Sequence, residues 1–358
     1  MLIVRGAVKD YDWGIVDGLA PWSEMTGGPQ AELWFGVHPG GPSPLIGADW
    51  ELTGEHLGDR FDVEAIPLLV KLLAAAKPLS VQVHPKRAVA EVQYALQQHG
   101  GDRIYTDPFE KTEMLIALQH FEAFVGWRPK EQALAILESI EGTDQARAAW
   151  DVGDMDHASR SLIAASTPDR IAALPHAAER AGLAEDELRA YRIVATLYPD
   201  DSGALITPLL AYLALDEGQA VFVPAGLPHS YIQGIGLEVM SSSDNVVRLG
   251  LTSKAVAIDH ALNALDQNLS PQVMRTSHGD LIWPIDSPFV VRVLRSGEER
   301  ILSGSYRIVL LIEGSAVVET DGAEATLKQG TAAVLGAKDP TAMIRADGLV
   351  AVIQSTER

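Results

Sequence analysis

The chain has 358 residues, of which 47% are hydrophobic and 21% charged, a balance typical of a soluble globular protein. Its formal net charge of −20 argues against a general nucleic-acid-binding protein, which needs a basic surface, and no apolar run reaches the ~18 residues of a membrane span. Because cysteine is absent, any metal must be bound by His, carboxylate, amide or backbone oxygen atoms. The N-terminus carries none of the features of a signal peptide, so we expect a cytoplasmic protein with neither nucleic-acid nor membrane partners.

The length predicts two or three domains, and the residue pattern changes twice along the chain. Residues 1 to about 127 carry short apolar stretches broken by Gly and Pro, which indicates mixed β structure with one helix at 87–98. From Pro129 to about Tyr198, apolar residues recur at helical spacing and predict a separate helical block. Strand-like segments return at 219–232 and 236–242. The last seventy or so residues alternate around Gly-containing turns, which predicts a small β domain.

Two short segments each place potential metal ligands two residues apart. In "VQVHP", Gln82 and His84 would leave the same face of a strand, and in "FEKTEML" Lys111 and Glu113 repeat that spacing. The turn and helix between these segments would let the second strand return beside the first. On its own, either pair is more often structural than functional, so each pair is only one part of a larger pattern.

The segment "VFVPAGLPHSYIQG" supplies the third part of the pattern. Its Pro- and Gly-containing turn would deliver His229 at the start of a strand, with Tyr231 on the same face. Together with Gln82, His84 and Glu113, His229 forms a set of nitrogen and oxygen ligands without sulfur. Such a set suits Zn²⁺ with at least one coordination position left open. The other eight histidines lack this context, and we interpret them as surface or core residues.

Two segments of this acidic chain contain basic residues and no acidic ones. Residues 66–80 include Lys71 and precede the Gln82 motif, and residues 245–258 include Arg248 and Lys254. A molecule with this net charge must attract an anionic substrate locally, against its overall field. The two segments therefore predict an anion site beside the metal site.

Six motifs together resemble the type I mannose-6-phosphate isomerases of the cupin superfamily. In chain order they are "YDWG", "AELWFGVHPGGPS", "KPLSVQVHPKR", "KTEM", "VFVPAGLPHSY" and "SDNVVRLGLTSK". The resemblance implies a zinc-dependent aldose–ketose isomerase that interconverts mannose 6-phosphate and fructose 6-phosphate. It also implies a mainly β fold with an α insertion: a cupin-type jelly-roll catalytic domain (1–128 and 199–285), a helical domain (129–198) and a C-terminal β domain (286–358).

The resemblance assigns roles to individual residues of this chain. The zinc ligands would be Gln82, His84, Glu113 and His229. Catalytic or pocket positions would be Lys111, Arg248, Glu238, Asp244 and Tyr231, and the phosphate would be held by Ser80, Lys71 and Lys254. Many family members have His where this chain has Glu110, so a mechanism that requires a histidine at that position is in doubt here.

Moving a carbonyl between C1 and C2 proceeds through an enediol and requires a base, whose identity the sequence leaves open. Lys111, Glu238, Asp244 and a metal-bound water are all candidates, whereas Arg248 suits electrostatic support because its pKa is normally above about 12. Two other functions also remain open. An iron-dependent cupin oxygenase would have no need for the two basic segments, and a non-enzymatic sugar-phosphate-binding protein would have no need for an open metal position.

Overall fold

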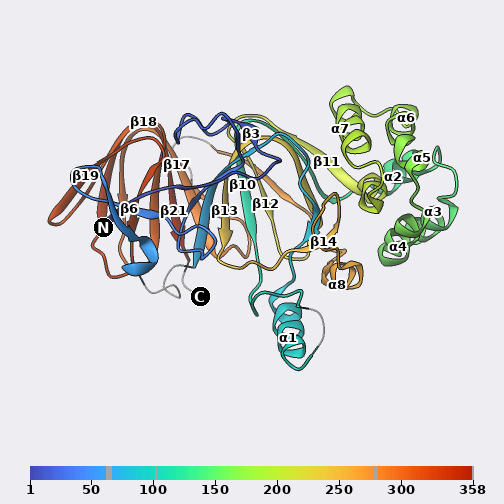
Figure 1. Ribbon diagram of the computed structural model, residues 1–358, viewed down its shortest axis with the longest axis horizontal. Helices are drawn as coiled ribbons and strands as arrows, with labels where there is room; N and C mark the ends of the chain where they lie inside the picture. Colours follow the sequence, from blue (N-terminus) through green and yellow to red (C-terminus); the bar gives the residue numbers. More distant parts are fainter. Residues whose placement is uncertain (62–66, 101–102, 277–280, 357–358) are drawn as a thin grey trace.

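The structure is a computed structural model that describes residues 1–61, 67–100, 103–276 and 281–356. The chain is mainly β with a helical insertion, as expected from its sequence (Figure 1). The molecule is elongated. Its two large sheets lie next to each other along the long axis, and the helical insertion lies at one end of the molecule. His278, one of the eight other histidines, and Glu64, which shortly precedes the basic segment 66–80, lie outside the described residues.

Within the described residues, the sheet at the middle of the molecule has ten strands in which β10 and β13 are central. Its seven-strand path runs β15-β12-β10-β13-β8-β5-β2, with β11 added to β10, and β9 and β14 added beside β13. The strands are β2 (Ala7–Lys9), β5 (Glu32–Phe35), β8 (Leu68–Ala75), β9 (Val81–Val83), β10 (Glu113–Trp127), β11 (Leu210–Leu215), β12 (Gln219–Val223), β13 (His229–Ser241), β14 (Val247–Gly250) and β15 (Gln272–Arg275).

The expectation that the strand bearing Gln82 lies directly beside the strand bearing Glu113 is wrong. Strand β13 lies between β9 and β10: it pairs with β10 along one edge and with β8 and β9 along the other. The physical reason is length, because the 13 residues of β13 give it enough backbone to pair with several strands. As a result, His229 at the start of β13 lies directly opposite Gln82.

The second sheet combines the two ends of the chain. Strand β1 pairs with β20, so the first residues complete a sheet built mostly from the last seventy, and β6 and β7 extend the same edge. In the described residues this sheet consists of β1 (Leu2–Arg5), β6 (Pro44–Ile46), β7 (Leu52–His56), β16 (Leu281–Ile282), β17 (Phe289–Ile301), β18 (Arg307–Thr320), β19 (Ala323–Leu327), β20 (Thr331–Leu335) and β21 (Ala342–Ser355). Strands β3 (Ile15–Val16) and β4 (Pro29–Gln30) form a separate pair.

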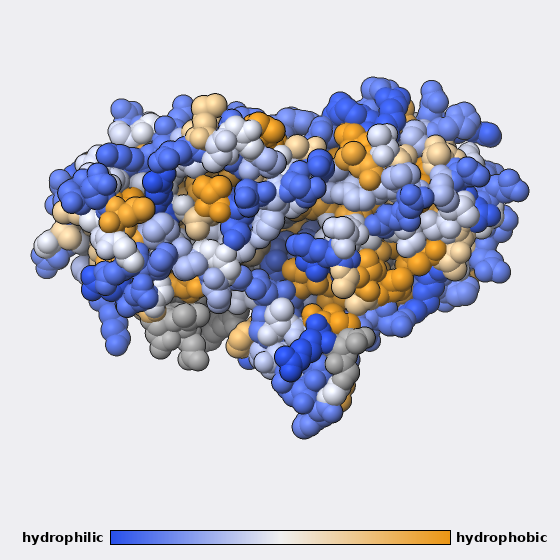
Figure 2. All heavy atoms as spheres, viewed as in Figure 1, coloured by the Kyte–Doolittle hydropathy of each residue, from blue (hydrophilic) through white to orange (hydrophobic). Residues whose placement is uncertain are grey.

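Six helices form the insertion between β10 and β11, where the sequence predicted a helical block. They are α2 (Lys130–Leu137), α3 (Asp144–Asp151), α4 (Met155–Ala165), α5 (Pro168–Ala172), α6 (Leu174–Arg180) and α7 (Glu185–Leu197). Two further helices lie outside the insertion, α1 (Arg87–Gln98), as predicted, and α8 (Ile258–Ala264), with short 3₁₀ turns at Leu57–Asp59 and Ser202–Leu209. Helix α1 projects from the body, which Figure 2 shows as a protrusion. None of the helices in the described ranges is long and apolar enough to cross a bilayer.

Two hydrophobic clusters join the parts of the molecule. One contains Val81, Phe124 and Val247 of the ten-stranded sheet together with Trp150 and Tyr191 of the helices. A second joins the two sheets, with the rings of Phe222 and Phe289 meeting edge to face. The division into three domains stays a prediction. Strands β1, β6 and β7 come from the first part of the chain but belong to the second sheet.

Candidate metal centre and adjoining pocket

The four predicted metal ligands come together from three segments: Gln82 lies in β9 and His84 directly after it, and Glu113 and His229 are the first residues of β10 and β13. Atoms of His84, Glu113 and His229 lie within 4.8 Å of one another, and Nε2 of Gln82 lies 3.1 Å from Nε2 of His229. Gly226 holds the turn before His229 with a φ of +97°, a conformation that glycine adopts without strain. Its amide donates a hydrogen bond to the carbonyl of His84 (2.7 Å), which fixes the two histidine segments to each other.

Both histidines direct Nε2 toward this centre. Nδ1 of His84 donates to the carbonyl oxygen of Asn245 (2.7 Å), and Nδ1 of His229 donates to that of Leu227 (3.1 Å). Since a carbonyl oxygen only accepts, each Nδ1 carries a proton, which leaves Nε2 of each ring as the atom that can bind a metal. Burial lowers the pKa of His84 to about 4, so its imidazole is neutral at pH 7.

The donor set fits a divalent metal. The Nε2 atom of each histidine lies 3.3 Å from an oxygen of Glu113, and both Nε2 of His84 and Oε2 of Glu113 are buried without a hydrogen-bond partner. A metal bound there would satisfy both atoms, and a half turn of the Gln82 amide would direct its oxygen to the same point. Burial alone would raise the pKa of Glu113, but Lys111, 2.7 Å away, and His84 hold it well below its usual value. The carboxylate is therefore ionised and able to bind a cation.

A pocket of about 460 Å³ adjoins this centre, and Gln82 and Glu113 line it, whereas His84 and His229 are buried behind its wall. The volume is in the usual range for a small-molecule site. Its described lining includes five basic and five acidic residues, although acidic residues outnumber basic ones by 48 to 28 in the whole chain. The basic residues are Lys71, Lys77, Lys111, Arg248 and Lys254, and the acidic ones are Asp12, Glu32, Glu113, Glu238 and Asp244.

Lys71, which we expected to hold the phosphate, forms ion pairs with two acidic side chains of the pocket. Its Nζ lies 3.3 Å from Glu32 and 3.4 Å from Glu238, and all three side chains are buried. Burial would lower the pKa of Lys71, but the two carboxylates raise it above its ordinary value, so the ammonium stays charged. The indole of Trp34 donates to Glu32 (2.8 Å) and completes this group. Two buried carboxylates therefore compensate the single charge of Lys71.

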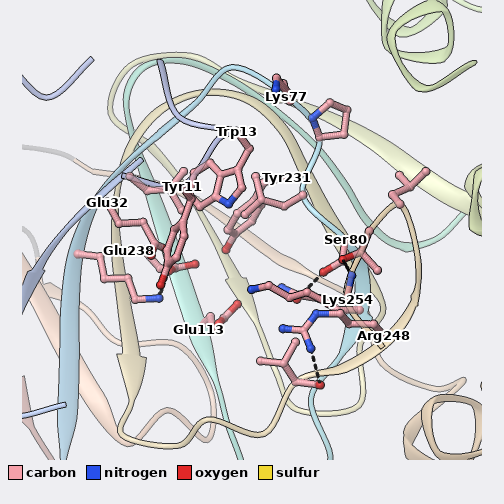
Figure 3. A pocket seen from close by; sticks show the side chains of 18 of the residues that line it. Tyr11, Trp13, Glu32, Lys77, Ser80, Glu113, Tyr231, Glu238, Arg248 and Lys254 are labelled. Atoms are coloured by element: carbon pink, nitrogen blue, oxygen red, sulfur yellow. Dashed lines mark hydrogen bonds and ion pairs between the residues drawn. The ribbon is translucent and has the colours of Figure 1, made fainter. Parts of the chain in front are cut away.

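Arg248 and Lys254 contrast with Lys71, because neither forms an ion pair with any described residue. Both line the pocket, and Figure 3 shows them with Ser80 on the opposite side from Glu32 and Glu238, with Glu113 between. Burial lowers the pKa of each, and Arg248 adds to the effect on Lys254. Two partly desolvated cations without a carboxylate partner are the feature expected of an anion site.

Glu238 has an unusual electrostatic environment. Burial and the charge of Glu113 raise its pKa to about 7, while Lys71 and Lys111 act in the opposite direction. Tyr231, two residues after His229, also lines the pocket, and burial raises its pKa. A carboxyl group that titrates near neutral pH suits acid–base work.

Asp244 lines the pocket, and its carboxylate forms a hydrogen bond with His38. Nε2 of His38 lies 2.5 Å from its Oδ2, and this hydrogen bond is the main cause of a lowered pKa for Asp244. Sequence reasoning missed His38, Glu32 and Trp34, although all three lie in the motif "AELWFGVHPGGPS". Their signal was the two-residue spacing of Glu32 and Trp34 on a buried strand. Glu110 is not among the described residues that line the pocket.

Comparison with known proteins gives one consistent family. The profile of the phosphomannose isomerase type I catalytic domain matches residues 1–130. Mannose-6-phosphate isomerase from Salmonella typhimurium is 31% identical over 374 residues, covering 93% of this chain and 94% of that protein. The mannose-6-phosphate isomerase from Escherichia coli is 29% identical, with 96% of this chain and 97% of that protein covered.

Solved structures agree along the whole chain. A crystal structure of a single-residue variant of phosphomannose isomerase from Salmonella typhimurium matches with a TM-score of 0.86 at 28% identity, covering 100% of both chains. A mannose 6-phosphate isomerase crystallised with zinc and yttrium bound matches with a TM-score of 0.82 at 27% identity, again over 100% of both chains. By sequence identity over nearly its full length and by its fold, the chain belongs to the type I mannose-6-phosphate isomerase family.

Proposed function

We propose that the protein is a metal-dependent aldose–ketose isomerase that interconverts mannose 6-phosphate and fructose 6-phosphate through an enediol. The observation that carries this proposal is the pairing of two features in one pocket. One is the donor set of Gln82, His84, Glu113 and His229, and the other is the pair of cations, Arg248 and Lys254, which have no acidic partner in the described part of the chain. The first suits a metal, and the second suits a phosphate.

Zn²⁺ is the metal we propose, because imidazole, amide and carboxylate donors without sulfur suit it, and the bound ion would polarise the sugar oxygens as a Lewis acid. Among the four proposed ligands, Glu113 is the single anionic one, since imidazole and amide side chains carry no negative charge. This arrangement leaves the centre with net positive charge next to the developing negative charge of an enediolate. The buried Lys111 lies beside Glu113 and adds a second positive group.

Glu238 is the residue we assign to proton transfer between C1 and C2. Its pKa of about 7 places both protonation states within reach at neutral pH, which matches the requirement to take a proton from one carbon and return it to the next. Lys111 and Asp244 also line the pocket and are the competing assignments. Variants of all three separate these assignments, because the true base should show the largest loss of kcat at saturating substrate.

The phosphate is assigned to the side of the pocket that contains Ser80, Arg248 and Lys254 (Figure 3). Positive charges held in fixed positions would bind the dianion and set the register of the sugar along the pocket. Lys71 lies on the other side with Glu32 and Glu238, so its proposed role is to stabilise these buried carboxylates and not to contact phosphate.

The two alternatives have less support. In an oxygenase, Arg248 and Lys254, which have no acidic partner among the described residues, would have no function. In a sugar-phosphate-binding protein without a metal, Nε2 of His84 and Oε2 of Glu113 would be buried for no functional reason. The proteins named in the comparisons are isomerases. The proposed substrate is a small sugar phosphate, and the proposed location is the cytoplasm.

Metal analysis of purified variants tests the metal centre. We expect about one equivalent of Zn²⁺ per chain in the parent, and substantial loss of metal in His84→Ala, Glu113→Ala and His229→Ala, since each variant removes one ligand. His260→Ala is a suitable control, because His260 contacts Tyr105 and lies outside the donor set. Normal metal content in the three ligand variants would refute the assignment.

A further inference from the structure

We propose that Asp107 and Asn245 form a clamp that fixes the tautomer of His84 and thereby sets the affinity of the metal centre. This inference rests on the proposed role of His84 as a metal ligand. The clamp consists of hydrogen bonds between the loop at 106–109 and the loop at 243–245. Neither Asp107 nor Asn245 lines the pocket, so their role would be to position His84 and not to contact substrate.

Asn245 is fully buried, and its backbone carbonyl accepts the Nδ1–H of His84 at 2.7 Å. Its side chain is saturated with hydrogen bonds to the other loop. Nδ2 donates one hydrogen to the carbonyl oxygen of Phe109 (2.7 Å) and shares the other between the carbonyl oxygen (2.8 Å) and Oδ1 (3.1 Å) of Asp107. Oδ1 accepts from the amide of Thr106 (2.9 Å). These contacts fix the position of the carbonyl that faces His84.

The carboxylate of Asp107 holds the same loop from the other side. Five donors face its two oxygens: the amide of Phe109 (2.9 Å), the hydroxyl of Ser243 (2.9 Å) and Nδ2 of Asn245 (3.1 Å) at Oδ1, and the amide of Asp244 (3.0 Å) and the hydroxyl of Thr106 (3.2 Å) at Oδ2. Two of the five are backbone amides, one at each oxygen, and these can only donate, so only a side chain with an acceptor at both positions satisfies the site. The amide at Oδ2 belongs to the pocket residue Asp244, so Asp107 also holds the backbone of that residue.

The connection to the metal follows from the chemistry of imidazole. A fixed acceptor at Nδ1 keeps the proton there and the lone pair on Nε2, which is the atom that faces Glu113. If the carbonyl of Asn245 moves away, the proton can shift to Nε2, where it competes with the metal. Groups that orient a metal-binding histidine typically change metal affinity about 10- to 100-fold when they are removed.

Asp107→Asn is the test variant, because the amide that it introduces cannot satisfy the five donors. Whichever oxygen becomes NH₂, one backbone amide, that of Phe109 or of Asp244, faces a second donor. We expect the Kd for Zn²⁺, measured by chelator competition without substrate, to rise about tenfold or more. We also expect ¹⁵N spectra of labelled histidine in the metal-free variant to show His84 shifting from the Nδ1–H form to a mixture of tautomers.

Asp17→Asn is a matched control. Asp17 is another loop carboxylate that accepts two backbone amides, from Thr26 (2.8 Å) and Gly27 (3.0 Å), but it does not contact the site. Its metal affinity and His84 spectrum should equal those of the parent. If Asp107→Asn fails to fold, Ser243→Ala removes a single hydroxyl from the clamp and should raise the Kd by about threefold.

The outcomes separate the clamp from the metal assignment. If Asp107→Asn folds and keeps the parent's Kd and tautomer, or if Ser243→Ala keeps them where Asp107→Asn does not fold, the clamp is refuted while the metal centre stands. If the parent binds no metal, or if His84→Ala binds it as tightly as the parent does, the proposed function itself fails. A rise in Kd in both Asp17→Asn and Asp107→Asn would also count against the clamp, since it would indicate a general effect of loop destabilisation.

Discussion

The ammonium of Lys71 lies 3.4 Å from Oε2 of Glu238, and both groups are buried in the wall of the pocket. The pair is formed across neighbouring strands, because Lys71 of β8 lies directly opposite Glu238 of β13. Glu32 of β5 contacts the same ammonium from the other side. One cation therefore compensates two carboxylates at the side of the pocket where we place the proton transfer.

Replacing Lys71 should change the pH dependence of the reaction. In the parent, Lys71 lowers the pKa of Glu238, which burial and Glu113 raise to about 7. Without the cation, that pKa moves higher, and less of the carboxylate is ionised at neutral pH. Lys71→Met should therefore shift the acidic limb of the kcat/KM profile to higher pH, with a larger loss of activity at pH 7 than at pH 8.5.

Lys77→Met is the control for this shift, because Lys77 also lines the pocket but pairs with the exposed Asp12. Its profile should keep the parent's acidic limb. Lys71→Met should also lower the free energy of unfolding by about 3 to 5 kcal/mol, since it leaves buried carboxylates without a counter-charge. A Lys71→Met profile that superimposes on that of the parent would rule out Glu238 as the group whose ionisation limits the rate.

The metal-free protein should lose stability as the pH falls from about 6.5 to 4. Burial lowers the pKa of His84 from 6.5 to about 4, so the folded state binds a proton less readily than the unfolded state does. The contribution of His84 is fully present above pH 6.5 and is lost as the pH falls toward 4. The shift corresponds to about 3 kcal/mol.

Urea unfolding of chelator-treated protein at pH 7 and pH 4.5 measures this effect. His84→Gln should remove part of the difference between the two pH values, whereas His157→Gln should keep it, because His157 is exposed on helix α4. An equal pH dependence in the parent and in His84→Gln would show that His84 is not the residue responsible.

Lys254→Ala should weaken binding of phosphorylated substrate. A charged contact of this kind contributes about 1 to 3 kcal/mol, so kcat/KM for mannose 6-phosphate should fall about 5- to 150-fold. Metal content should be retained. Ser80→Ala should act in the same direction, but Lys254→Ala is the clearer variant, since the Ser80 hydroxyl also donates to Gln82 of the metal centre (3.1 Å).

Lys328→Ala provides the matched control, because Lys328 lies over the ring of Trp50, away from the pocket. Its kinetics should equal those of the parent. If Lys254→Ala discriminated between mannose 6-phosphate and unphosphorylated mannose just as the parent does, the phosphate would have to bind elsewhere.

The helical insertion should support the fold without supplying metal ligands. His157 and His176 are its two histidines, and both are exposed, with His176 facing Glu179 at the helix surface. Replacing both by Gln should leave metal content and turnover close to those of the parent. A large loss of bound metal in the double variant would contradict the assignment of all ligands to the ten-stranded sheet.

The ligand set could be predicted from sequence because each part of it is local. Gln82 and His84 lie two residues apart, and the Gly226 turn shortly precedes His229, so short-range geometry indicated each segment, whereas the strand order that brings the segments together is long-range. The helix at 87–98 was predictable for the same reason. These features depend on backbone periodicity and on turn conformation, which a short segment expresses by itself.

The partners of Lys71 could not be predicted in this way. Glu32 and Glu238 are 39 and 167 positions away along the chain, and they meet Lys71 only because β5, β8 and β13 are neighbours in the sheet. The order of strands in a sheet is set by long-range packing and not by local pattern. The same reason explains why β1 joins the C-terminal strands and why β13 separates β9 from β10.

The most direct test of the central claim is an NMR assay of the metal-loaded and the metal-free protein with mannose 6-phosphate in D₂O. Metal-loaded protein should produce fructose 6-phosphate without oxygen consumption, and part of the product should carry deuterium at C1, as expected when an enediol exchanges its proton with solvent. Removal of the metal should abolish the conversion, and Zn²⁺ should restore it. Absence of fructose 6-phosphate with fully loaded protein, or equal turnover by metal-free protein, would contradict the account.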